Sequence, residues 1–223
     1  MISVIIPVLN EERVLPGALR RVFSQAGEAQ VIVADGGSSD RTLELVSAEP
    51  GIKLVHAPTG RARQMNAGAA EAGGDWLLFL HADTLLPEDA LLSIARLPAE
   101  VEAGGFTHQF SGKARGLRVV SWLHNFRCRR TKVFYGDQAL FVRRRLFVEL
   151  GGFPDVPILE DVMFGERLRQ VTRPTMLGSC VVTDSRKFEQ HGIWTSLLRV
   201  LLILASYELR LPIPARKFFA NVR

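Results

Sequence analysis

Short apolar runs alternate with helical patterns through the first hundred residues, and this alternation constrains the fold more than any other feature. Leu15, Leu19 and Val22, for example, fall on one face of the first helical pattern. A strand, a helix and a further strand in this order form a parallel pair joined by a right-handed crossover. The sequence therefore predicts an α/β fold around a parallel sheet. The predicted strands cover residues 2–7, 30–35, 52–57 and 76–80, and the predicted helices cover residues 11–25, 40–49 and 61–72.

The pattern loosens after residue 100. It predicts strands at 103–110 and 139–144, a basic amphipathic stretch at 114–127 and a helix at 160–170. No repeat, low-complexity segment or linker divides the chain. We therefore expect a single domain, residues 1–223, whose sheet continues in mixed order. Asn10 is expected to cap the first helix, and Ser39 or Asp40 the second.

Composition bears on the setting and the partners. Cys128 and Cys180 stand in no metal-ligand or redox spacing, and the opening MISVIIPV enters an apolar strand rather than an export signal. Both features favour a reduced, cytoplasmic setting. A formal charge of +5 favours anionic partners such as nucleotides, phospholipid head groups or nucleic acid, and charge alone does not choose among them.

Polar residues follow three of the predicted strands, in VIIPVLNEE, VIVADGGSSD and LFLHADT. Taken singly, Asn10 and Asp40 are explained as helix caps, and Asp35 with its two glycines as a turn. Carboxyl ends of parallel strands, however, meet at the edge of an α/β sheet where ligands bind. Their joint occurrence therefore predicts a ligand site.

Six motifs in order carry a resemblance that covers nearly the whole chain: VIIPVLNEE, VADGGSSDRT, GRARQMNAGAAEAGGDWLLFLHADT, YGDQALFVRR, GGFPDVPILEDVMFGERL and RKFEQHG. They resemble the successive motifs of family 2 glycosyltransferases with the GT-A fold. HADT with YGDQA resembles, more narrowly, a bacterial subgroup called selenodomain-associated transferases. The resemblance implies a Rossmann-like, mostly parallel sheet flanked by helices.

The same resemblance implies an inverting, metal-assisted transfer of a sugar from a nucleotide-diphosphate sugar to a hydroxyl acceptor, which could be lipid-linked, and no nucleic-acid partner. Residues 1–100 would form the nucleotide-binding half, 101–192 the acceptor and catalytic half, and 193–223 a C-terminal apolar and basic helical segment. The residues implied in donor nucleotide binding are Pro7, Leu9, Asn10, Glu11, Asp35, Arg61, Arg63 and Ala82. Those implied near the donor sugar or acceptor are Gly136, Asp137 and Gln138.

HADT departs from the Asp-x-Asp pattern of the family, because His81 stands at the first position and Asp83 keeps the last. The resemblance implies that Asp83 binds Mn²⁺ or Mg²⁺ together with the donor diphosphate, with His191 of RKFEQHG as a further ligand. His81 could join the metal, bind a ribose or satisfy a backbone group. The resemblance also implies that Asp161, beside Glu160, is the general base, although both acids also suit a helix N-terminus.

Two further stretches have several readings. Residues 194–209 are very apolar but include Arg199 and Glu208, and they fall short of the about 20 apolar residues of a membrane span. With Arg210, Arg216 and Lys217 after it, the segment fits the inner membrane surface, a buried packing helix or a homodimer contact. The basic run with Arg127, Arg129, Arg130 and Lys132 fits either a phosphate-gripping lid or a solvated face.

Other protein classes compete with this reading. A sugar nucleotidyltransferase would carry a glycine-rich basic loop after the first strand, which VIIPVLNEE lacks. A nucleotide-sugar binding module without catalysis is compatible with His81 in the altered motif. An oxidoreductase is disfavoured because no GxGxxG opens a helix after a strand.

Overall fold

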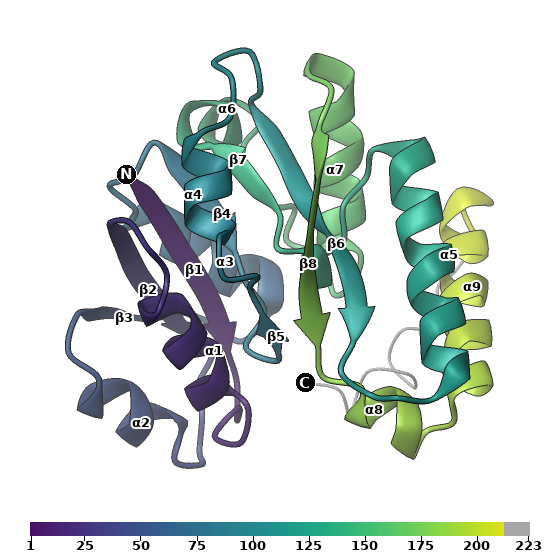
Figure 1. Ribbon diagram of the computed structural model, residues 1–223, viewed down its shortest axis with the longest axis horizontal. Helices are drawn as coiled ribbons and strands as arrows, with labels where there is room; N and C mark the ends of the chain where they lie inside the picture. The colour runs from purple at the N-terminus through teal and green to yellow at the C-terminus, as the bar shows by residue number, and fades with distance from the viewer. Residues whose placement is uncertain (212–223) are drawn as a thin grey trace.

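The computed structural model describes residues 1–211, through which one sheet of eight strands runs in the order β3-β2-β1-β4-β7-β6-β8-β5 (Figure 1). The strands are β1 (Ile2–Val8), β2 (Ala29–Asp35), β3 (Ile52–His56), β4 (Trp76–Phe79), β5 (Thr84–Leu85), β6 (Ala103–Phe110), β7 (Phe141–Arg143) and β8 (Thr175–Thr183). The strands β3, β2, β1 and β4 pair in parallel, as the alternating pattern predicts. Every residue of β4 is buried, because helices cover both faces of the sheet.

Beyond β4 the sheet becomes mixed. β7 runs antiparallel to both β4 and β6, β8 runs parallel to β6, and β5 runs antiparallel to β8. The prediction of one α/β domain with a mixed continuation of the sheet is therefore confirmed. The carboxyl ends of β1, β4, β6 and β8 all reach the same edge, and that edge carries the candidate site.

Helices flank the sheet on both faces, and their bounds follow. They are α1 (Leu15–Phe23), α2 (Thr42–Ala48), α3 (Arg61–Ala70), α4 (Ala90–Ala95), α5 (Arg115–Thr131), the 3₁₀ turn η1 (Gly136–Gln138), α6 (Arg144–Glu149), α7 (Glu160–Val171), α8 (Arg186–Gln190) and α9 (Ile193–Glu208). Buried side chains of α1 and α4 pack on one face of the sheet, and those of α3, α6 and α7 on the other.

A third, smaller apolar cluster joins α5, α8 and α9 beyond the end of β6. Phe110, Leu117 and Val120 form its buried part, and Phe188 and Ile193 pack against it. The helix α9 accounts for much of the predicted C-terminal segment, whereas Arg216 and Lys217 lie outside the described residues. Among residues 1–211, none of the helices combines the length and apolarity needed to cross a bilayer.

The predicted cap at Asn10 is wrong. The helix α1 begins at Leu15, and Asn10 adopts a left-handed backbone with φ 57°. Its side-chain oxygen instead accepts the N–H groups of Ser39 at 2.8 Å and Asp40 at 3.3 Å, which ties the loops after β1 and β2 together. Asp40 does lie before α2, where its carboxylate accepts the N–H of Thr42 at 2.9 Å.

Candidate active site

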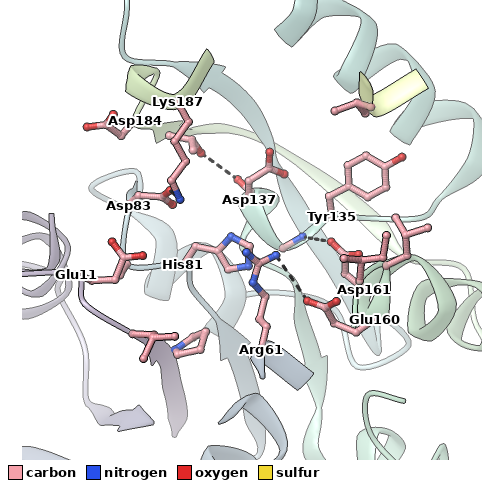
Figure 2. Close-up of a pocket in the computed structure, with 18 of the residues that line it drawn as sticks. Glu11, Arg61, His81, Asp83, Tyr135, Asp137, Glu160, Asp161, Asp184 and Lys187 are labelled. Atoms are coloured by element: carbon pink, nitrogen blue, oxygen red, sulfur yellow. Dashed lines mark hydrogen bonds and ion pairs between the residues drawn. The ribbon is translucent and has the colours of Figure 1, made fainter. Parts of the chain in front are cut away.

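A cavity of about 370 Å³ opens at the edge where the strand ends converge (Figure 2). The loops after β1, β4 and β8, the N-termini of α3 and α7, the η1 turn and one face of α9 line it. The predicted convergence of polar loops is confirmed for β1 and β4. From those loops Pro7, Leu9, Glu11, His81, Ala82 and Asp83 reach the cavity.

The loops after β1 and β2 are fixed by their own hydrogen bonds. The buried Gln64 donates to the carbonyl oxygens of Val8 at 2.6 Å and Ala34 at 3.0 Å, so α3 holds the two strand ends. The carboxylate of Asp35 accepts the N–H groups of Gly37 at 2.9 Å and Ser38 at 3.1 Å. Asp35 is therefore directed at its own loop.

Glu11, Asp83 and Lys187 lie together on one side of the cavity (Figure 2). The ammonium nitrogen of Lys187 lies 3.8 Å from a carboxylate oxygen of Asp83. Burial raises the pKa of Glu11, while the positive charge of Lys187 opposes that rise. Two carboxyl groups and one cation thus share a small region that suits a metal ion or the diphosphate of a ligand.

One carboxylate of the cavity, Asp83, suits a divalent cation, but it has no cluster of further protein ligands around it in residues 1–211. Within residues 1–211, no three His, Cys, Asp or Glu side chains are grouped so as to hold a metal by themselves. Asp83, His81 and His191 therefore do not come together as a ligand set. The carboxylate of Asp83 still suits Mg²⁺ or Mn²⁺, since such ions are commonly held by one or two carboxylates plus substrate phosphates.

His81 lies against the η1 turn rather than beside a cluster of ligands. A Cβ atom on Gly136 would collide with the imidazole Nε2 of His81, so glycine permits this contact. Burial, reinforced by the positive charge of Arg61, lowers the pKa of His81, and the imidazole is neutral at pH 7. Its Nε2 has no hydrogen-bond partner among the described residues.

Asp161 and Glu160 open α7 on the other side of the cavity (Figure 2). Asp161 accepts the N–H of Gly136 at 2.7 Å and that of Val162 at 2.8 Å. Burial and the adjacent charge of Glu160 raise the pKa of Asp161 above its usual 3.8. Glu160 is buried, and its Oε1 lies 3.6 Å from the guanidinium of Arg61. A carboxylate with raised proton affinity at a cavity wall can act as a general base.

Asp137 extends from the cavity toward the buried His108 and the largely buried His124. Its carboxylate oxygens lie 3.7 Å from Nε2 of His108 and 3.6 Å from Nε2 of His124, and the two imidazole rings are stacked. Burial lowers the pKa of His124 to about 4 and also lowers that of His108. Neutral imidazoles therefore surround this carboxylate at pH 7.

Several predicted residues stand away from the cavity. Asn10 and Asp35 brace the neighbouring loops, and Arg63 pairs with Asp155 at 2.8 Å on the surface. Gln138 is fully buried, where it donates to the carbonyl of Phe106 and accepts the N–H of Tyr135, so it supports the η1 turn instead of facing a sugar. His191, in contrast, does line the cavity, as an exposed residue at the end of α8.

The basic run after Phe126 does not line the cavity and is not a loop. It forms the last turns of α5, up to Lys132. Arg127 donates to the carbonyl of Val133 at 3.0 Å, and its guanidinium lies 3.5 Å from the ring centre of Tyr135. The lid prediction is therefore corrected to a helix end that supports the η1 turn from behind.

Sequence reasoning missed residues that follow β8 or lie on α9. Asp184, Lys187 and Phe188 reach the cavity from the end of β8 and from α8, and Arg199, Val200, Ile203 and Leu204 reach it from α9. The segment VVTDSRK carries a usable signal, because an apolar run ends there in an aspartate, as LFLHAD does.

Comparison with known proteins identifies the class. Residues 3–152 match the family model described as Glycosyl transferase family 2, and the chain therefore belongs to glycosyltransferase family 2. A PGL/p-HBAD biosynthesis glycosyltransferase of Mycobacterium tuberculosis is 34% identical over 170 residues, which cover 69% of this chain and 63% of that protein. An undecaprenyl-phosphate 4-deoxy-4-formamido-L-arabinose transferase of Aeromonas hydrophila is 34% identical over 133 residues, which cover 55% of this chain and 39% of that protein.

Solved structures bear on the fold alone. S. aureus TarS 1–349 in complex with UDP-GlcNAc aligns with a TM-score of 0.68 at 18% identity, over 83% of this chain and 58% of that one. The mannosyltransferase PcManGT from Pyrobaculum calidifontis, in complex with GDP-Man and Mn²⁺, aligns with a TM-score of 0.65 at 23% identity, over 81% of this chain and 56% of that one. The predicted GT-A fold is confirmed, whereas the narrower resemblance to selenodomain-associated transferases stays a prediction.

Proposed function

We propose that this protein is an inverting glycosyltransferase that moves a sugar from a nucleotide-diphosphate sugar to an acceptor hydroxyl. One observation carries the proposal: the cavity has Asp83 and Lys187 on one side and Asp161, with its raised pKa, on the other (Figure 2). A displacement with inversion needs this separation, because the base and the leaving diphosphate lie on opposite sides of the anomeric carbon. Membership of family 2 supports the same reaction.

The donor is proposed to lie with its nucleoside against the loop after β1, where Pro7, Leu9 and Glu11 line the cavity. Its diphosphate would then reach Lys187 and Arg61, which supply positive charge to the leaving group. Two of the structural neighbours were solved with UDP-GlcNAc and with GDP-Man, which supports a nucleotide sugar as the donor class.

Asp161 is proposed as the general base. Its carboxylate would take the proton of the acceptor hydroxyl while the acceptor oxygen bonds to the anomeric carbon and the bond to the diphosphate oxygen breaks. The N–H groups of Gly136 and Val162 hold the carboxylate in place, and Arg61 offsets the charge of the neighbouring Glu160. A positioned base of this kind contributes about 10²–10⁴-fold to a rate.

Asp83 is the residue proposed to hold a divalent cation, Mn²⁺ or Mg²⁺, together with the donor diphosphate. When bound, such a cation would take up negative charge from the departing diphosphate as a Lewis acid. A structural neighbour that contains Mn²⁺ with GDP-Man supports the use of a divalent metal. We leave His81 and His191 outside this ligand set, because the described residues do not group them with Asp83.

The acceptor is proposed to be lipid-linked. The wall beside Asp161 is apolar, with Ile158 and Leu159 from the loop before α7 and Val200, Ile203 and Leu204 from α9. A hydrocarbon chain would bury apolar surface there, whereas a free sugar would leave those side chains without a partner. A relative named for an undecaprenyl-phosphate substrate supports this class of acceptor.

A transfer assay tests the proposed function. The full chain would be incubated with UDP-, GDP- and dTDP-sugars, a glycolipid acceptor that carries free hydroxyl groups and Mn²⁺, and the release of nucleoside diphosphate would be followed. We expect release from one donor class that depends on the acceptor. Absence of release with every donor, from protein that still binds nucleoside diphosphates, would favour a binding module instead.

A further inference from the structure

The outward face of α5 combines large apolar side chains with arginines. Successive residues of an α-helix turn by about 100°, and the exposed residues of α5 all fall on one side of the helix. Trp122 is 61% exposed, and its ring stacks on the exposed Phe126. The face consists of Arg115, Arg118, Val119, Trp122, Leu123, Phe126, Arg129 and Arg130.

The helix α9 lies beside α5 and presents a second exposed apolar face (Figure 1). Its large exposed side chains are Trp194, Leu198, Leu201 and Leu202. The two helices meet at Gly116, where an added Cβ atom would lie 3.1 Å from Ile193 and 3.5 Å from the ring of Trp194. The exposed faces of α5 and α9 together are called the α5–α9 face below.

Charge distinguishes this face from an ordinary patch of exposed hydrophobic residues. The helix α5 contains five arginines and no acidic residue. Within residues 1–211, Arg115, Arg118 and Arg129 form no salt bridge, and the guanidinium of Arg130 lies 5.2 Å from the ring centre of Phe126. Aromatic and aliphatic side chains flanked by unpaired arginines are typical of helices that lie in the interface of an anionic bilayer.

We propose that the α5–α9 face docks on the surface of an anionic phospholipid membrane, with the two helices parallel to the bilayer plane. A second copy of the chain fits less well, because a two-fold contact would bring the arginines of two α5 helices together. The occupant we infer is therefore a lipid surface whose head groups pair with the arginines while Trp122, Phe126 and Trp194 enter the headgroup region.

Docking in this way would place the cavity beside the bilayer. Residues 200, 203 and 204 line the cavity, and by helical geometry residue 203 projects from α9 on the side opposite Leu198 and Leu201. The helix α9 would thus separate the membrane from the acceptor wall by its own width. This consequence rests on the proposed function, whereas the docking itself does not.

Vesicle sedimentation of the full chain tests the proposal. We expect binding to phosphatidylcholine vesicles that contain phosphatidylglycerol, weak binding to pure phosphatidylcholine, and release by salt. Arg115→Gln with Arg118→Gln should weaken binding about fivefold for each arginine removed. The matched control is Arg20→Gln with Arg96→Gln, which makes the same charge change at exposed sites on α1 and beside α4 and should change binding far less.

The apolar contribution is tested separately. Trp122→Ser with Trp194→Ser should weaken binding about tenfold or more, and the control Val148→Ser with Val171→Ser, at exposed sites on α6 and α7, should not. Circular dichroism and nucleoside diphosphate binding show whether each variant is folded with an intact cavity, which separates a failure of docking from a failure of the proposed function. Should the tryptophan variant misfold, the arginine pair decides.

Three results would overturn the proposal. The first is wild-type protein that stays in the supernatant with anionic vesicles. The second is an equal loss of binding in the Arg20 and Arg96 control, which would mean that net charge alone is responsible. The third is a wild-type dimer in light scattering that Trp122→Ser dissociates, which would assign the face to a second copy of the chain.

Discussion

The loops after β1 and β2 differ from the region around Asp137 in how their polar groups are satisfied. In these two loops, the side-chain oxygens accept hydrogen bonds from backbone N–H groups of the loops themselves. This holds for Asn10, Asp35 and Asp40. The buried side-chain polar atoms that lack a hydrogen-bond partner in the described part of the chain all lie elsewhere, and they belong to His81, His108, His124, Arg127, Tyr135, Asp137 and Glu160.

This difference indicates two kinds of binding surface. The loops after β1 and β2 keep their shape through internal hydrogen bonds. Four of the residues with unpaired buried atoms, His81, Tyr135, Asp137 and Glu160, line the cavity, and under the proposed function a sugar rich in hydroxyl groups would offer them partners. Leaving such atoms unpaired costs stability, and proteins accept that cost most often at functional sites.

The largest effect is expected for Asp161. If it is the base on the acceptor side, Asp161→Asn should lower transfer by about 10²–10⁴-fold while nucleoside diphosphates still bind, because Asp83 and Lys187 lie on the other side of the cavity. Single-turnover rates measure the first expectation and calorimetry the second. Asp155→Asn makes the same change at an exposed carboxylate and should transfer at the wild-type rate. Wild-type rates in Asp161→Asn would return this residue to a role at the N-terminus of α7.

The pH dependence of transfer should follow the same residue. Asp161 must be ionised to accept a proton, and its pKa is raised by burial and by Glu160. The rate should therefore fall on acidification at a pH above the ordinary aspartate value of about 3.9. A pH–rate profile measured under single-turnover conditions checks this, and a rate unchanged down to the ordinary range would show that no such group is needed.

Acid should destabilise the Asp137 region first. Burial lowers the pKa of His124 to about 4 in the folded protein, whereas the unfolded value is near 6.5. The unfolded chain then binds more protons between these values, so stability is lost as pH falls from about 6.5 toward 4, by up to about 3 kcal/mol for this one histidine. Urea unfolding of wild type and His124→Gln at several pH values measures the difference. The exposed His191→Gln serves as the control and should keep the wild-type pH dependence.

The two carboxylates Asp35 and Asp137 give a direct test of the contrast. Asp35→Ala leaves the N–H groups of Gly37 and Ser38 without their acceptor, and we expect a loss of about 1–3 kcal/mol in the free energy of unfolding. Asp137→Asn changes a carboxylate whose Oδ1 accepts no hydrogen bond in the described part of the chain, so stability should change by less than about 1 kcal/mol, while transfer falls. Equal destabilisation by both variants would remove the distinction between the two regions.

Much of the fold of residues 1–100 could be predicted from the sequence, because strand runs there are followed by helices and the polar residues stand at strand ends. Short elements such as β5 and α8 carry too little periodicity to be read, and β8 pairs with a strand far away in the chain. The places of His81, Glu11 and Asp83 at the cavity could be predicted from strand order. The sequence could not predict that Asp35 accepts hydrogen bonds from its own loop instead of facing the cavity. A carboxylate at the end of a strand can do either, and the two cases look the same in the sequence.

Other site residues depend on packing that no local pattern contains. Residues 81–83 are followed directly by β5, which pairs with the end of β8 just before α8. This pairing brings Lys187 of α8 to Asp83. His108 and His124 meet Asp137 from β6 and α5. The contacts of α9 with the cavity likewise require the third apolar cluster, which joins helices from distant parts of the chain.

Calorimetric titration of UDP, GDP and dTDP in the presence of Mn²⁺ tests the central claim most directly, that one cavity separates donor binding at Asp83 from catalysis at Asp161. We predict that wild type binds one of these nucleotides, that Asp83→Ala loses the Mn²⁺-dependent part of the affinity, and that Asp161→Asn binds as wild type does. Affinity that is unchanged in Asp83→Ala, or lost in a folded Asp161→Asn, would contradict the proposed arrangement of the site.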